Sequence, residues 1–269
     1  MYFNYEASSV LMTNFIQELI LLCTVAFCAG FVDAIVGGGG LLQTPATLLI
    51  LPHYPVASIF GTTKIPSLAG TSVAAYKYAK QVKLNYKVLI ACVLAAFFAA
   101  LLGAYCVSLI DNAVIKPVIL CILIAVAIYT FFNKQFGIQQ HKAHSVKNQV
   151  LLAALFGFII GFYDGLIGPG TGSFLILVFV AVLGFDFIGA SAHAKIVNIA
   201  TNVAALIYFG STGHVLFEYA MPMAIFNVAG SYFGAKLALL KGNKFVRIFF
   251  LIVVFGTILR FAWDVLKFN

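Results

Sequence analysis

Charged side chains are what this sequence lacks most. Only 9% of its 269 residues are Asp, Glu, Lys or Arg, whereas 63% are hydrophobic, and the mean hydropathy is +1.06. An ordinary soluble domain carries about 25% charged residues, so the few present here cannot cover a surface exposed to water. The composition therefore excludes a soluble enzyme, a nucleic-acid-binding protein, a disordered chain and a disulfide scaffold. It predicts a helical membrane protein with several spans, because each span needs about 20 apolar residues.

Motifs for metals, disulfides, nucleotides and catalysis are also missing from the sequence. It contains no CxxC pair, no P-loop, no HExxH and no GxSxG. The five cysteines are odd in number and lie inside apolar stretches, so we interpret them as small buried side chains. The sequence therefore predicts no catalytic residue, no metal site and no cofactor. We attribute the net charge of +8 to Lys and Arg in cytoplasmic loops, and we expect no nucleic-acid partner.

The hydrophobic segments fall into two sets of five. The first fourteen residues contain Glu6 but no Lys or Arg, so we expect the first segment to be retained rather than cleaved as a signal peptide. The pattern predicts an all-α polytopic protein with about eight to ten membrane segments, made of an N-terminal repeat 15–132, a basic cytoplasmic linker 133–148 and a C-terminal repeat 149–266. The expected segments are 15–36, 41–51, 57–78, 88–110 and 114–132, followed by 149–167, 172–185, 188–209, 217–240 and 245–266.

The two sets are an internal duplication with a constant offset of 131 residues. The stretch GFVDAIVGGGG, which begins at Gly30, aligns with GFYDGLIGPGT, which begins at Gly161. One register that holds over most of each half indicates duplication rather than chance. The same offset pairs Asp33 with Asp164, Lys64 with Lys195, and Gly103 with Gly234.

Basic residues are distributed oppositely in equivalent loops of the two repeats. The stretch 77–87 holds four lysines, whereas its counterpart 210–218 has no Lys or Arg; conversely, 241–247 holds three basic residues and its counterpart only Lys116. Because Lys and Arg collect on the cytoplasmic side, equivalent loops should lie on opposite sides of the membrane. This predicts two inverted repeats with glycine-broken helices, as in secondary transporters. Whether the short second segment of each repeat crosses the membrane or is re-entrant stays open.

Each repeat contains a glycine-rich break at membrane depth. Glycine runs hold a helix poorly, and Pro169 removes a backbone donor. Broken backbone inside a bilayer is tolerated where protein or a water-filled cavity satisfies it, and a helix that restarts there directs N–H groups at an anion. The alternative is close helix packing through small residues. The candidate substrate ligands are Gly37, Gly38, Gly39 and Gly40 in the first break and Gly168, Gly170, Thr171 and Gly172 in the second.

One aspartate precedes each break, Asp33 in the first repeat and Asp164 in the second. A carboxylate at membrane depth is costly and is by default a functional hypothesis. Two interpretations stay open: proton or cation coupling, or capping of N–H groups that the break leaves without partners. His193 is a further candidate for proton transfer, although a single histidine is more often a hydrogen-bonded structural residue.

A lysine heads a polar stripe on the third segment of each repeat. Residues at i, i+3 and i+7 share one face of a helix, so we expect both stripes to line a shared cavity in which two lysines attract an anion. Alternatively, the lysines extend to the membrane surface or neutralise the two aspartates. The stripes are Lys64, Ser67 and Thr71, and Lys195, Asn198 and Asn202; nearby donors are Thr63, Gln43, Thr44 and Ser173.

These motifs resemble the TauE/SafE sulfite exporter family, also described as the toluene-sulfonate-uptake permease superfamily, and its YfcA-type branch in particular. The resemblance rests on the paired GF-x-D-x-x-x-G-x-G motifs, on the TTK and HAK segments, and on GFYDGLIGPGTGSF followed by ASAHAKIVNIATN. It extends over about residues 30–265. It implies a multi-pass protein of the bacterial inner membrane that moves small sulfur-containing or organic anions such as sulfite, sulfoacetate or other sulfonates.

The mechanism expected from this resemblance and the repeats is that of a secondary carrier. It would work by alternating access and be coupled to the proton motive force. A passive anion channel is the alternative. The expected partners are the small anionic substrate and the lipid bilayer, and a homo-oligomer is left open.

Overall fold

The computed structural model describes residues 2–109 and 146–267, and this part of the chain folds into helices without strands. The expected all-α membrane architecture is confirmed. Gly242 has a positive φ of 74° and divides the last helix into two parts. The helices are α1 (Tyr2–Val36), α2 (Gly40–Ile50), α3 (Val56–Ala79), α4 (Tyr86–Ser108), α6 (Val146–Leu166), α7 (Thr171–Ala181), α8 (Phe187–Ser211) and α9 (Phe217–Lys267).

The second helix of each repeat is short. α2 and α7 have 11 residues each, so each is about 16 Å long and cannot alone cross a hydrocarbon core of about 30 Å. The expected segment 172–185 is corrected at its end, because α7 stops at Ala181 and Gly184 then takes a positive φ of 77°. The expected segment 114–132 and most of the linker 133–148 lie outside the described residues.

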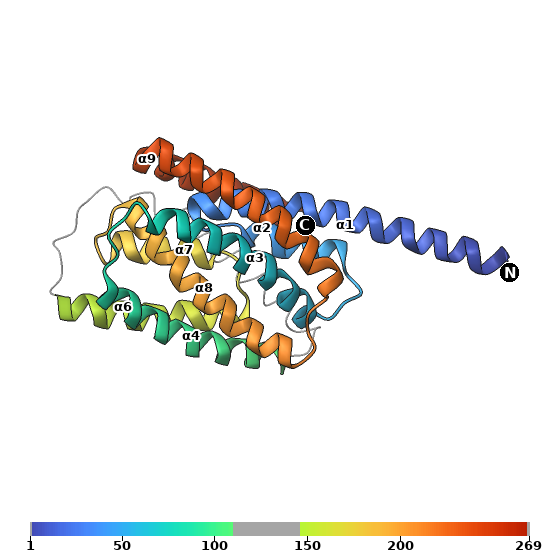
Figure 1. The fold of residues 1–269 in the computed structure, drawn as a ribbon, viewed down its shortest axis with the longest axis horizontal. Helices are drawn as coiled ribbons and strands as arrows, with labels where there is room; N and C mark the ends of the chain where they lie inside the picture. The colour runs from blue at the N-terminus through green and yellow to red at the C-terminus, as the bar shows by residue number, and fades with distance from the viewer. Residues whose placement is uncertain (1, 110–145, 268–269) are drawn as a thin grey trace.

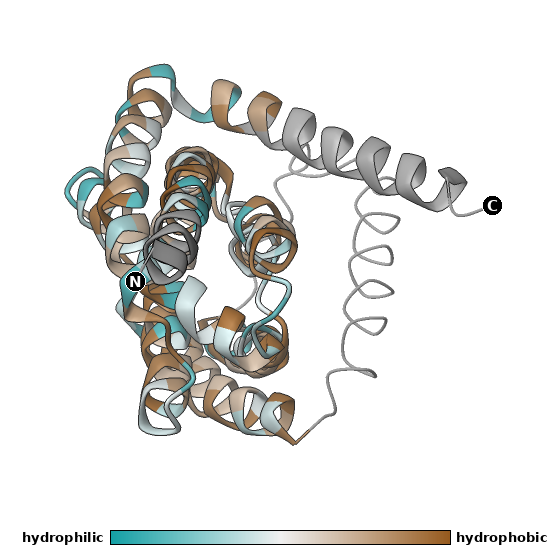
Figure 2. Cartoon of the chain, turned by 90° about the vertical axis from the view of Figure 1, so that its right-hand side faces the viewer, coloured by the Kyte–Doolittle hydropathy of each residue, from teal (hydrophilic) through white to brown (hydrophobic). Residues whose placement is uncertain are grey.

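Five of the described helices are long and apolar enough to cross a membrane. Large hydrophobic side chains are exposed along them, including Phe98 at 64%, Leu151 at 69% and Ile225 at 71%, and lipid would cover such side chains. Figure 2 shows brown, hydrophobic residues along the helices, whereas several connecting turns are teal. The candidate spans are Met12–Val36, Tyr86–Ser108, Val146–Leu166, Phe187–Ser211 and Phe217–Val246.

Corresponding helices of the two repeats make corresponding contacts. α4 packs along α6, and α1 packs along α9 (Figure 1). A Cβ atom on Gly161 of α6 would lie 2.4 Å from the carbonyl oxygen of Ala96 on α4, and a Cβ atom on Gly30 of α1 would lie 2.3 Å from that of Asn227 on α9. The 131-residue offset relates these two contacts. The duplication in the sequence is therefore also present in the packing, which depends on close approach through small residues.

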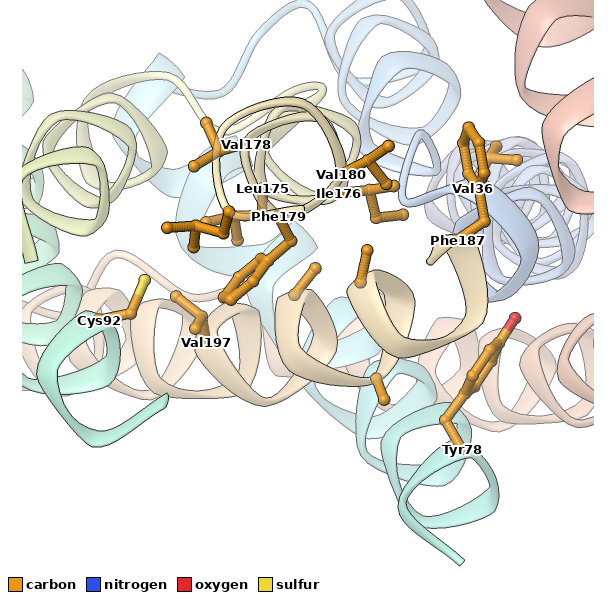
Figure 3. Close-up of a cluster of buried hydrophobic side chains, with 14 of the residues drawn as sticks. Val36, Tyr78, Cys92, Leu175, Ile176, Val178, Phe179, Val180, Phe187 and Val197 are labelled. Atoms are coloured by element: carbon orange, nitrogen blue, oxygen red, sulfur yellow. The ribbon is translucent and has the colours of Figure 1, made fainter. Parts of the chain in front are cut away.

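An apolar cluster between α7 and α8 holds α7, the short helix after the second break, in place. Phe179 of α7 points toward α8 near Val197, and Leu175 and Ile176 belong to the same cluster (Figure 3). All four side chains are at most 1% exposed. Close packing of this kind fixes the direction of α7 and so places the second break beside the first.

Candidate functional site between the two helix breaks

The two helix breaks lie against each other. A Cβ atom on Gly37 would lie 2.3 Å from the carbonyl carbon of Gly172, so a side chain at Gly37 would meet the backbone of the other break. The N–H of Ser173 donates to the carbonyl oxygen of Gly37 at 3.0 Å, and its hydroxyl donates to that of Val36 at 2.9 Å. The start of α7 is therefore anchored on the end of α1, which belongs to the other repeat.

The positions immediately before the short helices α2 and α7 require glycine for different reasons. Gly170 has a φ of 87°, a conformation that side chains disfavour. Gly39 has a helical φ of −58°, but a Cβ atom there would lie 2.4 Å from the carbonyl oxygen of Ala29. One break therefore needs glycine for its backbone conformation, and the other needs it for close approach to α1.

Both aspartates contact the break of their own repeat, but their carboxylate oxygens have different partners. Asp33 Oδ1 accepts a hydrogen bond from the N–H of Gly39 at 3.3 Å, and Asp33 Oδ2 accepts one from the Thr71 hydroxyl at 3.1 Å. Asp164 Oδ1 accepts one from the Thr171 hydroxyl at 2.7 Å. Asp164 Oδ2 is buried and lies 3.0 Å from the Lys64 ammonium nitrogen. The contacts of Asp33 therefore favour the capping interpretation.

Each lysine reaches the broken helix of the other repeat. Lys64 Nζ donates to the carbonyl oxygen of Asp164 at 2.9 Å, and Lys195 Nζ donates to that of Asp33 at 2.7 Å. Lys64 Nζ also lies 3.0 Å from Asp164 Oδ2, in an ion pair whose side chains are 8% and 3% exposed. The lysines therefore occupy equivalent positions, but the structure gives a direct carboxylate partner to Lys64.

A cavity of about 40 Å³ lies where the two breaks meet α3 and α8. Most of the residues that line it were predicted as site residues from the sequence, but Phe60 and Ile167 were not. Phe60 lies one turn before Lys64 on α3, and Ile167 immediately precedes Gly168. In the sequence, only this closeness to the predicted site residues could have indicated that they line the cavity. The cavity is lined by Asp33, Gly37, Gly40, Thr44, Phe60, Thr63, Lys64, Ser67, Asp164, Ile167, Gly168, Gly170, Thr171, Gly172, Asn198 and Asn202.

Several residues selected from the sequence do not line this cavity. Lys195 is not among the lining residues, because its Nζ donates to the carbonyl oxygen of Asp33, so the expectation that both lysines face one cavity stays a prediction. Gln43 supports the wall instead: its amide donates to the carbonyl oxygen of Thr63 at 3.1 Å and accepts from Asn227 at 2.9 Å. The selected residues outside the lining are Lys195, Thr71, Gln43, Ser173, Gly38, Gly39 and His193.

His193 is held by hydrogen bonds and ring packing between α8 and the residues around it. Its Nδ1 lies 2.7 Å from the carbonyl oxygen of Gly189, and its Nε2 accepts the N–H of Asn85 at 2.9 Å. An Nε2 that accepts leaves the proton on Nδ1, so these bonds fit a neutral ring. The ring packs against Phe179 and Phe185, at centroid distances of 5.3 and 4.6 Å. His193 therefore joins α8 to the turn before α4, away from the cavity.

The cavity lining contains one cation and several neutral hydrogen-bond donors. Lys64 supplies the ammonium group, Ser67 supplies a hydroxyl, and Asn198 and Asn202 supply amides, whereas the Thr63 hydroxyl already donates to the carbonyl oxygen of Phe60 at 3.0 Å. Two carboxylates in the same lining oppose an anion as long as both are ionised. Within the described part of the chain, no group of three or more His, Cys, Asp or Glu side chains could hold a metal ion.

Comparison with known proteins indicates the class of protein. Residues 22–261 match the family model described as sulfite exporter TauE/SafE. The chain is 32% identical over 253 residues to a probable membrane transporter protein of Haemophilus influenzae, with 93% of this chain and 96% of the relative covered. No solved structure matches the chain.

Two further relatives carry the same description. A probable membrane transporter protein of a Sinorhizobium species is 34% identical over 246 residues, with 91% of this chain and 93% of the relative covered. The probable membrane transporter protein YfcA of Escherichia coli K12 is 30% identical over 233 residues, with 87% and 85% covered. The chain therefore belongs to the sulfite exporter TauE/SafE family and is a multi-pass membrane transporter.

Proposed function

We propose that this transporter is a secondary carrier of small sulfur-containing or organic anions, such as sulfite, sulfoacetate or other sulfonates, in the bacterial inner membrane. The observation that carries the proposal is the small polar cavity between the two helix breaks, with the ammonium group of Lys64 in its lining. Both repeats contribute to the lining, so a movement of one repeat against the other would change access to the cavity from either side. This geometry supports alternating access.

The size of the cavity favours a compact ligand. Its volume of about 40 Å³ is roughly three times the 10–15 Å³ that one water molecule needs. A sulfite or sulfonate group is of this order, and its three oxygens could accept from Lys64, Ser67 and Asn198 together. A longer organic chain would have to extend out of the cavity.

A flux assay in proteoliposomes tests the proposal. Sulfite, sulfate, thiosulfate and two-carbon sulfonates are supplied under an imposed pH gradient, and accumulation of at least one sulfur anion above its equilibrium level is expected. Lys64→Gln should abolish it, whereas Lys83→Gln, at an exposed lysine outside the cavity, should not. Reversal potentials that follow the anion gradient alone, without pH dependence, would indicate a passive channel instead.

The inverted arrangement of the repeats is part of the proposal. It places the basic stretches 77–87, 133–148 and 241–247 in the cytoplasm. With an odd number of crossings in each repeat, both termini then face the periplasm. Reporter fusions after Asn269 and within 210–213 test this, and a cytoplasmic signal from both would contradict the inverted arrangement.

A further inference from the structure

Asp164 differs from Asp33 in that one of its carboxylate oxygens pairs with a lysine ammonium group. Both oxygens of Asp33 accept hydrogen bonds from neutral groups, Gly39 and Thr71. Asp164 Oδ2 instead lies 3.0 Å from Lys64 Nζ, in a side chain that is only 3% exposed and lines the cavity. A proton on Asp164 Oδ2 and the Lys64 ammonium group would therefore compete for the same oxygen.

The charges in the cavity lining explain why a proton matters for anion binding. The lining contains one cation, Lys64, and two carboxylates, Asp33 and Asp164. With both acids ionised, an entering anion meets net negative charge and an ammonium group already engaged by Asp164. A proton on Asp164 Oδ2 removes one negative charge and frees the ammonium group for a new partner.

We propose that Asp164 is the proton-binding group of this carrier, and that the anion binds at the Lys64 ammonium group only when Asp164 is protonated. One proton and one singly charged anionic group then cross the membrane together, and neither crosses alone. Asp33 keeps its role as the cap of the first break. The inference rests on the proposed function, because it assigns the coupling step to one residue of the same cavity.

The groups around Asp164 leave Lys64 as its cationic partner in the described part of the chain. α4, which packs along α6, contains no acidic residue. The neighbouring Tyr163 is engaged elsewhere, because its hydroxyl donates to the carbonyl oxygen of Pro169 at 2.6 Å. The other groups near Asp164 are Thr171 on α7, Asn198 and Asn202 on α8, Asp33 on α1, and Lys195 of α8 on the carbonyl oxygen of Asp33.

Binding measurements test the coupling without transport. Coupling free energies are reciprocal, so if protonation favours the anion, the anion must favour protonation. Adding isethionate, a sulfonate that does not itself take up protons near neutral pH, to the purified protein in weakly buffered detergent should cause uptake of about one proton per bound anion. Asp164→Asn should reduce this proton uptake at least tenfold at equal anion occupancy, whereas Asp186→Asn, at an exposed aspartate outside the cavity lining, should leave the proton-to-anion ratio unchanged.

Infrared spectroscopy identifies the proton site directly. Lowering the pH should produce the carbonyl band of a protonated carboxylic acid, and that band should be missing in Asp164→Asn and present in Asp33→Asn. Failure of any Asp164 band to appear, or proton uptake that persists in Asp164→Asn, would overturn the inference whether or not isethionate is transported.

Transport then separates the coupling step from the proposed function. In proteoliposomes with sulfite or isethionate, an inward proton gradient should drive accumulation by the wild type and acidify the lumen. Asp164→Asn should not respond to the proton gradient. Its anion uptake with the gradient should be no greater than its anion exchange at equal pH on both sides. Accumulation by the wild type together with undiminished coupling in Asp164→Asn refutes the assignment to Asp164. A wild type that moves neither anion refutes the proposed function for these probes, and the infrared result still decides the proton site.

Discussion

The two lysine–aspartate contacts of this transporter differ although duplication made their residues equivalent. Lys195 donates to the carbonyl oxygen of Asp33, at 2.7 Å, and forms no ion pair with its carboxylate in the described part of the chain, whereas Lys64 contacts both the carbonyl oxygen and the carboxylate of Asp164. The difference has an identifiable source in the sequence. Asp33 receives a hydroxyl from Thr71 of α3, whose counterpart in the other repeat is Asn202; Asp164 receives one from Thr171, whose counterpart is Gly40.

The helix packing, in contrast, has stayed symmetric. Gly103 of α4 faces the carbonyl oxygen of Phe162, and its counterpart Gly234 of α9 faces that of Phe31, at 2.2 and 2.3 Å from an added Cβ atom. Backbone approach tolerates few alternatives, whereas polar side chains can exchange partners as long as each buried group stays paired. The two repeats therefore share one scaffold but use their charges differently.

The largest effect should come from removing the lysine that pairs with a carboxylate. Lys64→Met leaves Asp164 buried without a cation, which costs about 3–5 kcal/mol, whereas Lys195→Met removes a hydrogen bond to a neutral carbonyl, worth about 1.5–3 kcal/mol. Unfolding titrations in detergent should show this order, and Lys64→Met should also abolish transport.

A second substitution tests whether the two lysine contacts differ in charge. Asp164→Asn added to Lys64→Met should restore much of the lost stability, because the uncompensated charge is removed. Asp33→Asn added to Lys195→Met should restore none, since Lys195 contacts the carbonyl oxygen of Asp33. Equal recovery in both double variants would show that the two contacts are equivalent after all.

The next effect separates the two breaks. Gly37 and Gly168 are equivalent and both have positive φ, 75° and 90°, so alanine costs about 1–2 kcal/mol of backbone strain at either. At Gly37 the new Cβ atom would also meet the carbonyl carbon of Gly172 at 2.3 Å, which adds about 1–3 kcal/mol. At Gly168 it would meet the flexible Lys64 Nζ at 3.3 Å. Gly37→Ala should therefore lower the thermal stability in detergent more than Gly168→Ala; equal losses would mean that the breaks do not touch.

Much of the site could be predicted from the sequence, because its elements are local. The glycine runs, the aspartates before them and the i, i+3, i+7 stripes each follow from one stretch of chain, and the duplication shows that they recur. The difference between Lys64 and Lys195 could not be predicted, since it depends on how α7 docks on the end of α1 through Ser173. The role of His193 likewise depends on Asn85, 108 residues away in the chain.

Packing between the repeats supplies a smaller effect that should be equal on both sides. Gly30→Ala and Gly161→Ala each place a Cβ atom against the backbone of the partner helix, at 2.3 Å from Asn227 and 2.4 Å from Ala96. Each should cost about 1–3 kcal/mol through overpacking. Matched decreases in melting temperature are expected, and a loss in only one variant would show that the helix pairs have diverged as the charges have. Gly210→Ala, at a position with open space around it, is the control.

The smallest effect concerns the hydroxyl that each aspartate accepts. Thr71→Val and Thr171→Val keep the shape of the side chain and remove the donor, so each should cost about 1 kcal/mol of stability. Their effects on transport should differ. Without Thr71, Asp33 still accepts the N–H of Gly39 and its cap persists. Without Thr171, the Asp164 carboxylate has Lys64 as its remaining partner among the described residues, so it competes more strongly with an anion for that ammonium group. The affinity for isethionate should therefore fall in Thr171→Val and stay unchanged in Thr71→Val, as measured by binding titrations. An equal loss of affinity in both variants would remove the distinction between the repeats.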